Sequence, residues 1–270
     1  MSRGSRNDAM TRAVTGLIVP AVLLLGWELL VRIAQIPHYI LPAPSLVLAT
    51  LWTNLGSLMQ SWWFTVKITF GALALSAVLG VGLAALFAMS RWAERMLLPV
   101  AIVLQVTPIV AIAPLILIYV DSTTAALLIC AWIVAFFPIL SNTVIGLRSA
   151  DANLKDLFTL YQASRWQRLR LLLVPSALPY FMAGLKIAGG LSLIGAVVAE
   201  FTAGAAGRET GLASRILEAS FRTEVPKMFA ALLLVSLTGI AIFLLFNALG
   251  RVLLGRWHET EHGRTDRGGP

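Results

Sequence analysis

The chain has 270 residues, of which 58% are hydrophobic and only 13% are charged, and its formal net charge is +8. A mean hydropathy of +0.83 is typical of a protein that lies in a bilayer, and it excludes an ordinary soluble domain. The positive charges are spread over loops instead of forming a stripe with exposed aromatic residues, so nucleic acid is not an expected partner. Cys130 is the single cysteine, so the sequence predicts no disulfide and no metal site.

Six runs of mostly apolar residues are long enough to cross a hydrocarbon core of roughly 30 Å as helices. The predicted spans are Val14–Ile33, Ile68–Met89, Leu97–Val120, Thr124–Ile145, Phe181–Phe201 and Phe229–Leu249. A polar segment, residues 1–13, precedes them, and a polar tail, residues 257–270, follows them. We therefore expect an all-α, polytopic membrane protein with one transmembrane domain over residues 1–270.

Arg and Lys residues predict the orientation of these spans, because short cytoplasmic loops retain positive charge during insertion. If both termini are cytoplasmic, most of the basic residues fall on the inner side, and the outer loops keep only Arg208, Arg215, Arg222 and Lys227. We therefore expect a multi-pass protein of the bacterial inner membrane with both termini in the cytoplasm.

The first outer loop contains Leu41-Pro42-Ala43-Pro44-Ser45, a rigid turn followed by an apolar pattern to about Leu58. We expect Ser45 to cap a short helix on the outer surface. In the third and fourth spans, Pro108, Pro114 and Pro138 predict kinks, which serve either a central path or simple packing.

Polar side chains inside spans are costly and often functional. The candidates for a translocation path are Gln105, Thr107, Asn142, Ser192 and Glu200. Glu200 lies late in the fifth span, so we expect it near the outer mouth. It would serve there as a gate or entry group, or pair with a nearby arginine such as Arg208.

A polar, Arg-rich hairpin, residues 151–180, precedes the fifth span. Leu154, Leu157, Phe158 and Tyr161 recur at helical spacing and predict one apolar face. We expect Asn153 to cap this helix, with Asp156 approximating a capping box. Because such a short helix is marginal in water, its apolar face needs a cover.

The second arm of the hairpin alternates basic and apolar residues before two prolines that we expect to break the backbone. The basic residues are Arg165, Arg168 and Arg170, the apolar ones are Trp166, Leu169 and Leu172, and the prolines are Pro175 and Pro179. The pattern has two interpretations. One is an interfacial amphipathic hairpin with snorkelling arginines, and the other is a docking element for a soluble subunit.

These residues carry a resemblance to a known family. The hairpin resembles the EAA loop of ABC importer permeases, through Asp156-Leu157-Phe158, Gln162-Ala163-Ser164-Arg165-Trp166-Gln167, Leu173-Val174-Pro175 and Ala177-Leu178-Pro179. The continuation Gly184-Leu185-Lys186-Ile187 and Gly195-Ala196-Val197-Val198-Ala199-Glu200-Phe201 is similar to the nitrate, sulfonate and taurine branch, as is Leu41-Pro42-Ala43-Pro44-Ser45.

The resemblance implies a type I importer permease fold (MetI-like) that works by alternating access as a homodimer. It implies a cytoplasmic ATPase that binds ATP-Mg, a periplasmic or lipid-anchored solute-binding protein, and contact with membrane lipid. The solute would be a sulfonate-, taurine- or nitrate-like anion, or a thiamine-pyrimidine precursor or riboflavin-like heterocycle. The residues that would couple to the ATPase are Leu154, Asp156, Leu157, Phe158, Tyr161, Gln162, Ala163, Ser164, Arg165, Trp166 and Pro175.

The hairpin departs from the family pattern at two places. Asp156-Leu157-Phe158 replaces Glu-Ala-Ala, and Gln162 stands where the family has glycine. Glycine accepts positive φ at little steric cost and glutamine does not, so we expect a turn of different shape.

Three functional classes remain distinguishable from the sequence. The chain has no Gly-x-x-x-x-Gly-Lys-[Ser/Thr] sequence, so we expect a transport subunit without enzymatic activity or a cofactor of its own. A self-sufficient channel or secondary carrier is the alternative, although the spans hold few ionisable groups. His258-Glu259-Thr260-Glu261-His262 matches a zinc-protease motif, but it lies in the polar tail, where we expect no metal.

Overall fold

The computed structural model describes residues 3–205 and 211–262, with side chains over residues 18–205 and 211–254. All regular structure in these residues is helical. The elements are α1 (Arg3–Ile33), α2 (Pro44–Thr53), α3 (Leu55–Met89), α4 (Arg91–Val106), α5 (Ile109–Tyr119), α6 (Thr123–Arg148), α7 (Ala152–Leu160), α8 (Arg165–Arg168), the π-helical turn η1 (Leu169–Leu173), α9 (Val174–Ala205), α10 (Leu212–Phe221) and α11 (Val225–His262). This confirms the predicted all-α class.

Four helical segments of the described chain are long and apolar enough to cross a membrane. They are Leu55–Met89, Thr123–Arg148, Arg165–Ala205 and Val225–Leu254. The pair α4 and α5 makes a fifth if both helices belong to one span. The first predicted span, Val14–Ile33, begins outside the residues whose side chains are described, so the predicted total of six spans stays a prediction.

The third predicted span, Leu97–Val120, is broken at Pro108, one of the positions where the sequence predicted a kink. α4 and α5 meet at an angle of 102°. Thr107 and Pro108 both have extended backbone at this break, with ψ of 122° and 117°. Pro108 has no N–H to continue the hydrogen bonding of α4, and the residue before a proline disfavours helical backbone, so the chain turns here instead of kinking.

The centre of the bundle is α6, which packs against α3 on one side and α9 on the other. Two glycines of α9 permit the close approach. A Cβ atom at Gly184 would lie 2.9 Å from the Pro138 carbonyl oxygen, and one at Gly195 would lie 2.9 Å from the Ala131 Cα atom. Small residues at this spacing let two membrane helices meet backbone to backbone. They therefore belong to packing between α6 and α9.

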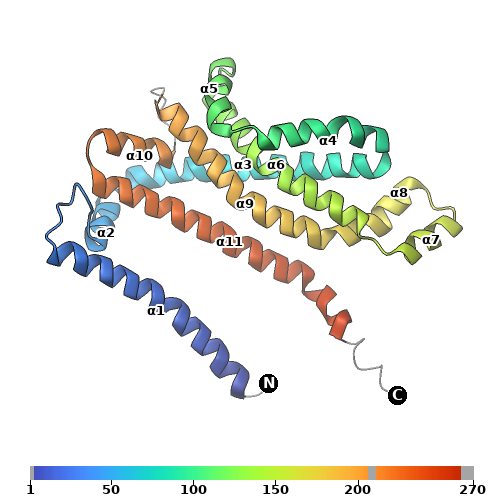
Figure 1. The fold of residues 1–270 in the computed structure, drawn as a ribbon, viewed down its shortest axis with the longest axis horizontal. Helices are drawn as coiled ribbons and strands as arrows, with labels where there is room; N and C mark the ends of the chain where they lie inside the picture. Colours follow the sequence, from blue (N-terminus) through green and yellow to red (C-terminus); the bar gives the residue numbers. More distant parts are fainter. Residues whose placement is uncertain (1–2, 206–210, 263–270) are drawn as a thin grey trace.

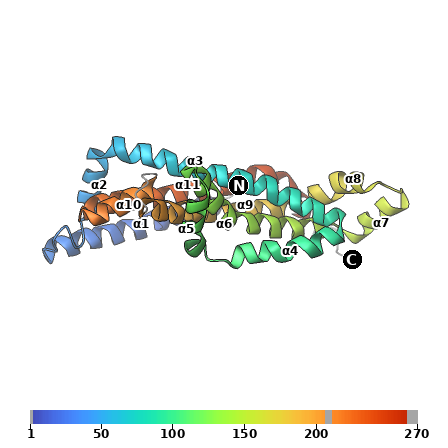
Figure 2. The same cartoon turned by 90° about the horizontal axis from the view of Figure 1, so that it is seen from above.

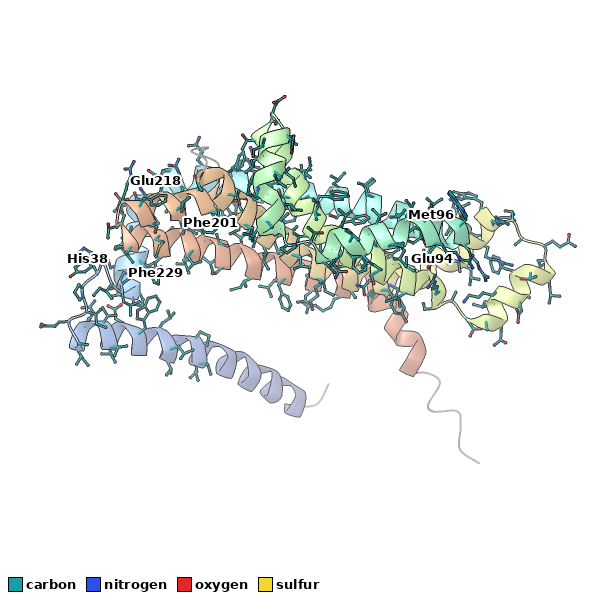
Figure 3. All side chains as sticks on the ribbon, turned by 45° about the horizontal axis from the view of Figure 1, so that its top comes forward. His38, Glu94, Met96, Phe201, Glu218 and Phe229 are labelled. Atoms are coloured by element: carbon teal, nitrogen blue, oxygen red, sulfur yellow. The ribbon has the colours of Figure 1, made fainter. Side chains whose placement is uncertain are left out.

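The bundle is elongated, and its two ends differ (Figures 1 and 2). One end carries α7 and α8, and the other carries α2 and α10. Figure 3 places Glu94 and Met96 at the first end, and Phe201 and Glu218 toward the second. α1 runs along the outside and leaves Leu23 and Leu25 more than 60% exposed. It meets α11 through Trp27, whose ring centroid lies 5.9 Å from that of Phe229.

The predicted cap of the short outer helix is wrong. Ala43 is the N-cap residue of α2, and Pro44 begins the helix, because its fixed φ suits the first helical position. Ser45 instead contacts Glu28 of α1. Its N–H donates to Glu28 Oε2 over 3.0 Å and its hydroxyl donates to Oε1 over 2.7 Å. A carboxylate from α1 therefore occupies the N-terminus of α2 and joins the two helices.

Candidate functional site

The hairpin made of α7, the turn after it and α8 forms one tip of the molecule (Figures 1 and 2). Leu154 and Leu157 on α7 are 45% and 43% exposed, and Phe158 is half-buried. Beyond them, Leu160 and Tyr161 are about 80% exposed. The single chain thus leaves the apolar face of α7 uncovered, and the sequence pattern missed the contribution of Leu160.

Both arms of this hairpin have side-chain caps. The predicted cap Asn153 is wrong, since Asp151 Oδ1 accepts from the backbone N–H groups of Asn153 and Leu154, over 2.7 and 3.3 Å. On the second arm, Ser164 Oγ accepts from the Gln167 N–H, and the Gln167 side chain accepts from the Ser164 N–H. This reciprocal capping box fixes where α8 begins, and it places Ser164, Arg165 and Trp166 after the turn.

The turn itself contains Gln162 at a φ of 50°. Gln162 adopts the left-handed conformation that glycine favours, so the expectation that glutamine would not accept a positive φ here is wrong. Its N–H donates to the Thr159 carbonyl over 3.0 Å, and the next N–H, of Ala163, donates to the Phe158 carbonyl over 3.0 Å. These bonds satisfy the end of α7 and hold the strained residue in place.

The two arms are also joined to each other and to the bundle. Arg168 Nη2 donates to Thr159 Oγ1 over 2.7 Å. Lys155 Nζ donates to the Arg148 carbonyl at the end of α6 over 3.0 Å. Arg165 makes a longer contact of 3.5 Å to the Met89 carbonyl at the end of α3. The hairpin therefore sits on the ends of α3 and α6 as one unit.

The predicted backbone break at Pro175 and Pro179 does not occur. The helix runs from α8 through η1 into α9, and Pro175 and Pro179 both lie within α9. In the π turn, the Val174 N–H donates to the Leu169 carbonyl, one residue further back than in an α-helix. Such a π-bulge adjusts the helix just before Pro175, which has no N–H to donate. Movement at the tip can thus pass directly into α9.

The five candidates for the translocation path are not gathered at one place. Gln105 is exposed on α4, and Thr107 Oγ1 donates to the Val103 carbonyl over 2.7 Å at the break after that helix. Asn142 Nδ2 donates to the Pro138 carbonyl over 2.8 Å. Ser192 is fully buried and its hydroxyl donates to the Gly189 carbonyl over 3.0 Å. Their role in transport stays a prediction.

Glu200 is fully buried, and it contacts the start of α10. Its Oε2 accepts from the Thr65 hydroxyl and from the Ala213 N–H, each over 3.1 Å. A Cβ atom at Gly211 would collide with Glu200 Oε1. Glu200 therefore receives the N-terminus of α10, which favours a carboxylate. Arg208, its predicted partner, lies outside the described residues.

α10 makes further polar contacts at the same end of the bundle. Arg215 Nε donates to Ser61 Oγ over 3.1 Å, and Arg215 Nη1 donates to Glu218 Oε2 over 2.8 Å. That guanidinium holds the pKa of the Glu218 carboxyl below its ordinary value. The end of the bundle that carries α2 and α10 is thus bound together by polar contacts that no sequence motif indicated.

A cavity of about 430 Å³ lies between α9 and α11. Lys186 and Arg251 line it together with Asn247, and no carboxylate is among its lining residues. The Lys186 ammonium lies 4.5 Å from the centroid of the Phe243 ring. Phe246 is the aromatic residue of the lining, so the cavity presents cationic and aromatic groups, which suit an anion or an electron-rich ring.

The zinc-protease motif at His258 and His262 lies outside the residues whose side chains are described. Among the side chains that are described, no group of three or more His, Cys, Asp or Glu residues is placed to hold a metal ion.

Residues 76–258 match the model of one protein family, the binding-protein-dependent transport system inner membrane component. The riboflavin transport system permease protein RibX of Chloroflexus aurantiacus is 35% identical over 241 residues, which are 88% of each chain. The formylaminopyrimidine transport permease protein ThiX of Halalkalibacterium halodurans is 33% identical, over 86% of this chain and 92% of the relative.

More distant similarities agree with these. The putative aliphatic sulfonates transport permease protein SsuC of Bacillus subtilis is 26% identical over 92% of this chain and 89% of its own. Among solved structures, an amino acid ABC transporter crystallised with histidines superposes with a TM-score of 0.60 at 16% identity, over 77% of this chain and 97% of that chain. At that identity, the superposition shows a shared fold.

Proposed function

The chain belongs to the family of binding-protein-dependent transport system inner membrane components, and from that membership we propose how this permease subunit of an ABC importer is assembled and coupled. It is a multi-pass inner-membrane protein whose relatives are transport subunits. ATP hydrolysis is assigned to the partner ATPase, so no cofactor is assigned to this chain. The permease would expose its solute site to the two sides of the membrane in turn.

Membership of the family implies an ATPase partner and a solute-binding protein partner. We assign ATPase docking to the tip formed by α7 and α8, in a homodimer with both termini in the cytoplasm. The observation that carries this assignment is the uncovered apolar face of Leu154, Leu157 and Tyr161 on a tip that is hydrogen-bonded to α3 and α6. Because η1 joins that tip to α9 without a break, closure of the ATPase would move α9 directly.

For the solute, we propose a small heterocycle. The relatives named for riboflavin and formylaminopyrimidine transport are 35% and 33% identical to this chain, and the sulfonate relative is 26% identical. A sulfonate-, taurine- or nitrate-like anion is the second candidate. The cavity that contains Lys186 and Arg251 favours it, since a fixed anion would compensate both cations.

The docking assignment is tested by the double substitution Leu157→Asp with Phe158→Asp. Two carboxylates in the apolar face should abolish co-purification of the ATPase, while the chain still inserts in the membrane. The matched control is Trp52→Asp with Phe221→Asp, which changes two side chains that are 77% and 79% exposed at the other end of the bundle. Retention of the ATPase by the α7 variant would refute the docking site.

The transport assignment is tested by purification of the tagged chain from native membranes and identification of the proteins that accompany it. We expect a P-loop ATPase and a solute-binding protein, whose bound ligand then identifies the solute. A chain that moves solute in liposomes without an ATPase would instead be a channel or secondary carrier.

A further inference from the structure

A basic pocket of about 540 Å³ lies where the tip of α7 and α8 meets the bundle. Its charged lining residues are Arg91, Glu94, Arg148, Lys155 and Arg168. Lys155 and Arg168 come from the tip, and Arg91 and Arg148 come from α4 and α6. The pocket thus joins two parts of the molecule with an excess of positive charge.

The contacts of the described residues do not balance this charge. Glu94, the one carboxylate of the lining, forms an ion pair with Arg148. Arg91 has no ion pair or hydrogen bond among the described residues. Arg168 binds Thr159 through Nη2, whereas its Nε atom is buried and has no hydrogen-bond partner in the described part of the chain. A buried guanidinium N–H without an acceptor is unfavourable, so an anionic acceptor would be favoured there.

The surroundings of the pocket indicate what carries that anion. A second cavity, of about 350 Å³, shares Arg91 and Glu94 with it and continues along α4 past Arg95 to Leu98 and Pro99. Beside this second cavity, α4 exposes a row of apolar side chains at helical spacing. These are Trp92, Met96, Val100 and Val103, between 55% and 73% exposed. A basic, anion-binding site that continues into an apolar helix face fits a molecule with an anionic head and hydrocarbon chains.

We propose that this pocket binds the phosphate group of an anionic phospholipid from the cytoplasmic leaflet, with its acyl chains along α4. Basic pockets at the cytoplasmic ends of membrane helices bind such headgroups, and exposed tryptophan marks the interfacial level. Figure 3 shows Glu94 and Met96 together at this end of α4, next to α8. The inference rests on the proposed orientation of the chain.

The headgroup would act as a bridge between the coupling tip and the bundle. It would lie between Lys155 and Arg168 on one side and Arg91 and Arg148 on the other, and so replace repulsion between these cations by shared attraction. The tip would then be held firmly against α3 and α6. Stimulation of the partner ATPase by the solute-binding protein would therefore depend on anionic lipid.

The experiment reconstitutes the importer complex in nanodiscs of phosphatidylcholine, with or without phosphatidylglycerol. Native mass spectrometry counts the phosphatidylglycerol molecules that remain bound to the permease, and ATPase stimulation by the binding protein is measured on the same samples. The test variants are Arg168→Gln and Lys155→Gln, which each remove one positive charge from the pocket. Arg168→Lys keeps the charge and should retain phosphatidylglycerol. Arg170→Gln is the matched control, because Arg170 is exposed on η1 and does not line the pocket.

We expect bound phosphatidylglycerol on the wild-type permease and about fivefold weaker retention for each glutamine variant. Stimulation should fall in phosphatidylcholine alone, and the Arg170→Gln control should behave as wild type. Equal retention by all variants would overturn the proposal. So would a glutamine variant that loses ATPase association equally in both lipids with unchanged lipid retention, since the cations would then contact the ATPase.

Lipid retention is counted without any transport assay. A complex that retains lipid at this pocket but moves no solute would refute the proposed function and leave the lipid site standing.

Discussion

Arg168 Nη2 lies 2.7 Å from Thr159 Oγ1, and this hydrogen bond joins the two arms of the α7–α8 tip across its turn. Thr159 is nine residues before Arg168, so the contact is set by the turn between them. It supplements the caps at Asp151 and Ser164, which define each arm separately. The tip is thereby a connected unit that can transmit a movement instead of absorbing it.

Removal of the hydrogen bond between Arg168 and Thr159 should weaken the coupling between the partner ATPase and the bundle. Thr159→Val keeps the shape of the side chain and loses the acceptor, which costs about 0.5–1.5 kcal/mol of tip stability. We expect weaker stimulation of the ATPase by the binding protein, with unchanged folding of the bundle. Thr53→Val, at the end of α2, is the control and should leave stimulation unchanged. Full stimulation in Thr159→Val would show that the bond has no part in coupling.

Gln162 gives a second prediction, because its φ of 50° is strained for a residue with a side chain. The left-handed conformation costs about 1–2 kcal/mol, which Gln162→Gly should relieve, less a smaller loss from the freedom of glycine in the unfolded chain. Resistance of the turn to limited proteolysis should stay equal or increase. Gln162→Val should lower it and weaken ATPase association. If the valine variant matches wild type, the turn is not under this strain.

The close packing of α6 and α9 predicts that Gly184 and Gly190, both in α9, differ in how well they tolerate a larger side chain. Gly184→Val places a side chain against the Pro138 carbonyl and should destabilise the protein by about 1–3 kcal/mol or prevent its accumulation. Gly190→Val introduces the same side chain where, apart from the neighbouring residues and backbone of α9 itself, no atom lies within 4 Å of the added Cβ. Thermal unfolding in detergent should separate the two. Equal loss in both variants would argue for a helix propensity effect instead of packing.

We expect Glu200 to hold the first turn of α10 in place. Glu200→Leu leaves the Ala213 N–H without its acceptor, which costs about 1–3 kcal/mol, while the Thr65 hydroxyl keeps the Ser61 carbonyl as an acceptor. Hydrogen exchange at the first turn of α10 should therefore become faster. Glu200→Gln keeps an oxygen acceptor and should preserve most of the protection. Unchanged exchange in the leucine variant would show that α10 is held by other contacts.

Much of the fold could be predicted from the sequence, because long apolar runs and helical periodicity are local properties. The spans predicted at Thr124–Ile145 and Phe229–Leu249 lie within α6 and α11, and the family was identified from the motif around Gln162. Local sequence also placed the apolar residues of α7 on one face. The helix caps were harder to predict from the sequence. Asp151 and Asn153 are both good N-cap residues, and only the backbone conformation chooses between them.

The sequence by itself determined that the chain is helical, that it lies in a membrane and that a polar hairpin precedes α9, since each follows from residue types a few positions apart. Residue types alone did not choose the 102° angle at Pro108 or the left-handed conformation of Gln162, although both are held by neighbouring residues. Tertiary structure decided the burial of Glu200, which depends on partners far along the chain. Thr65, 135 residues before Glu200, is such a partner. No local pattern specifies such a contact, because its free energy arises only when separate helices have packed.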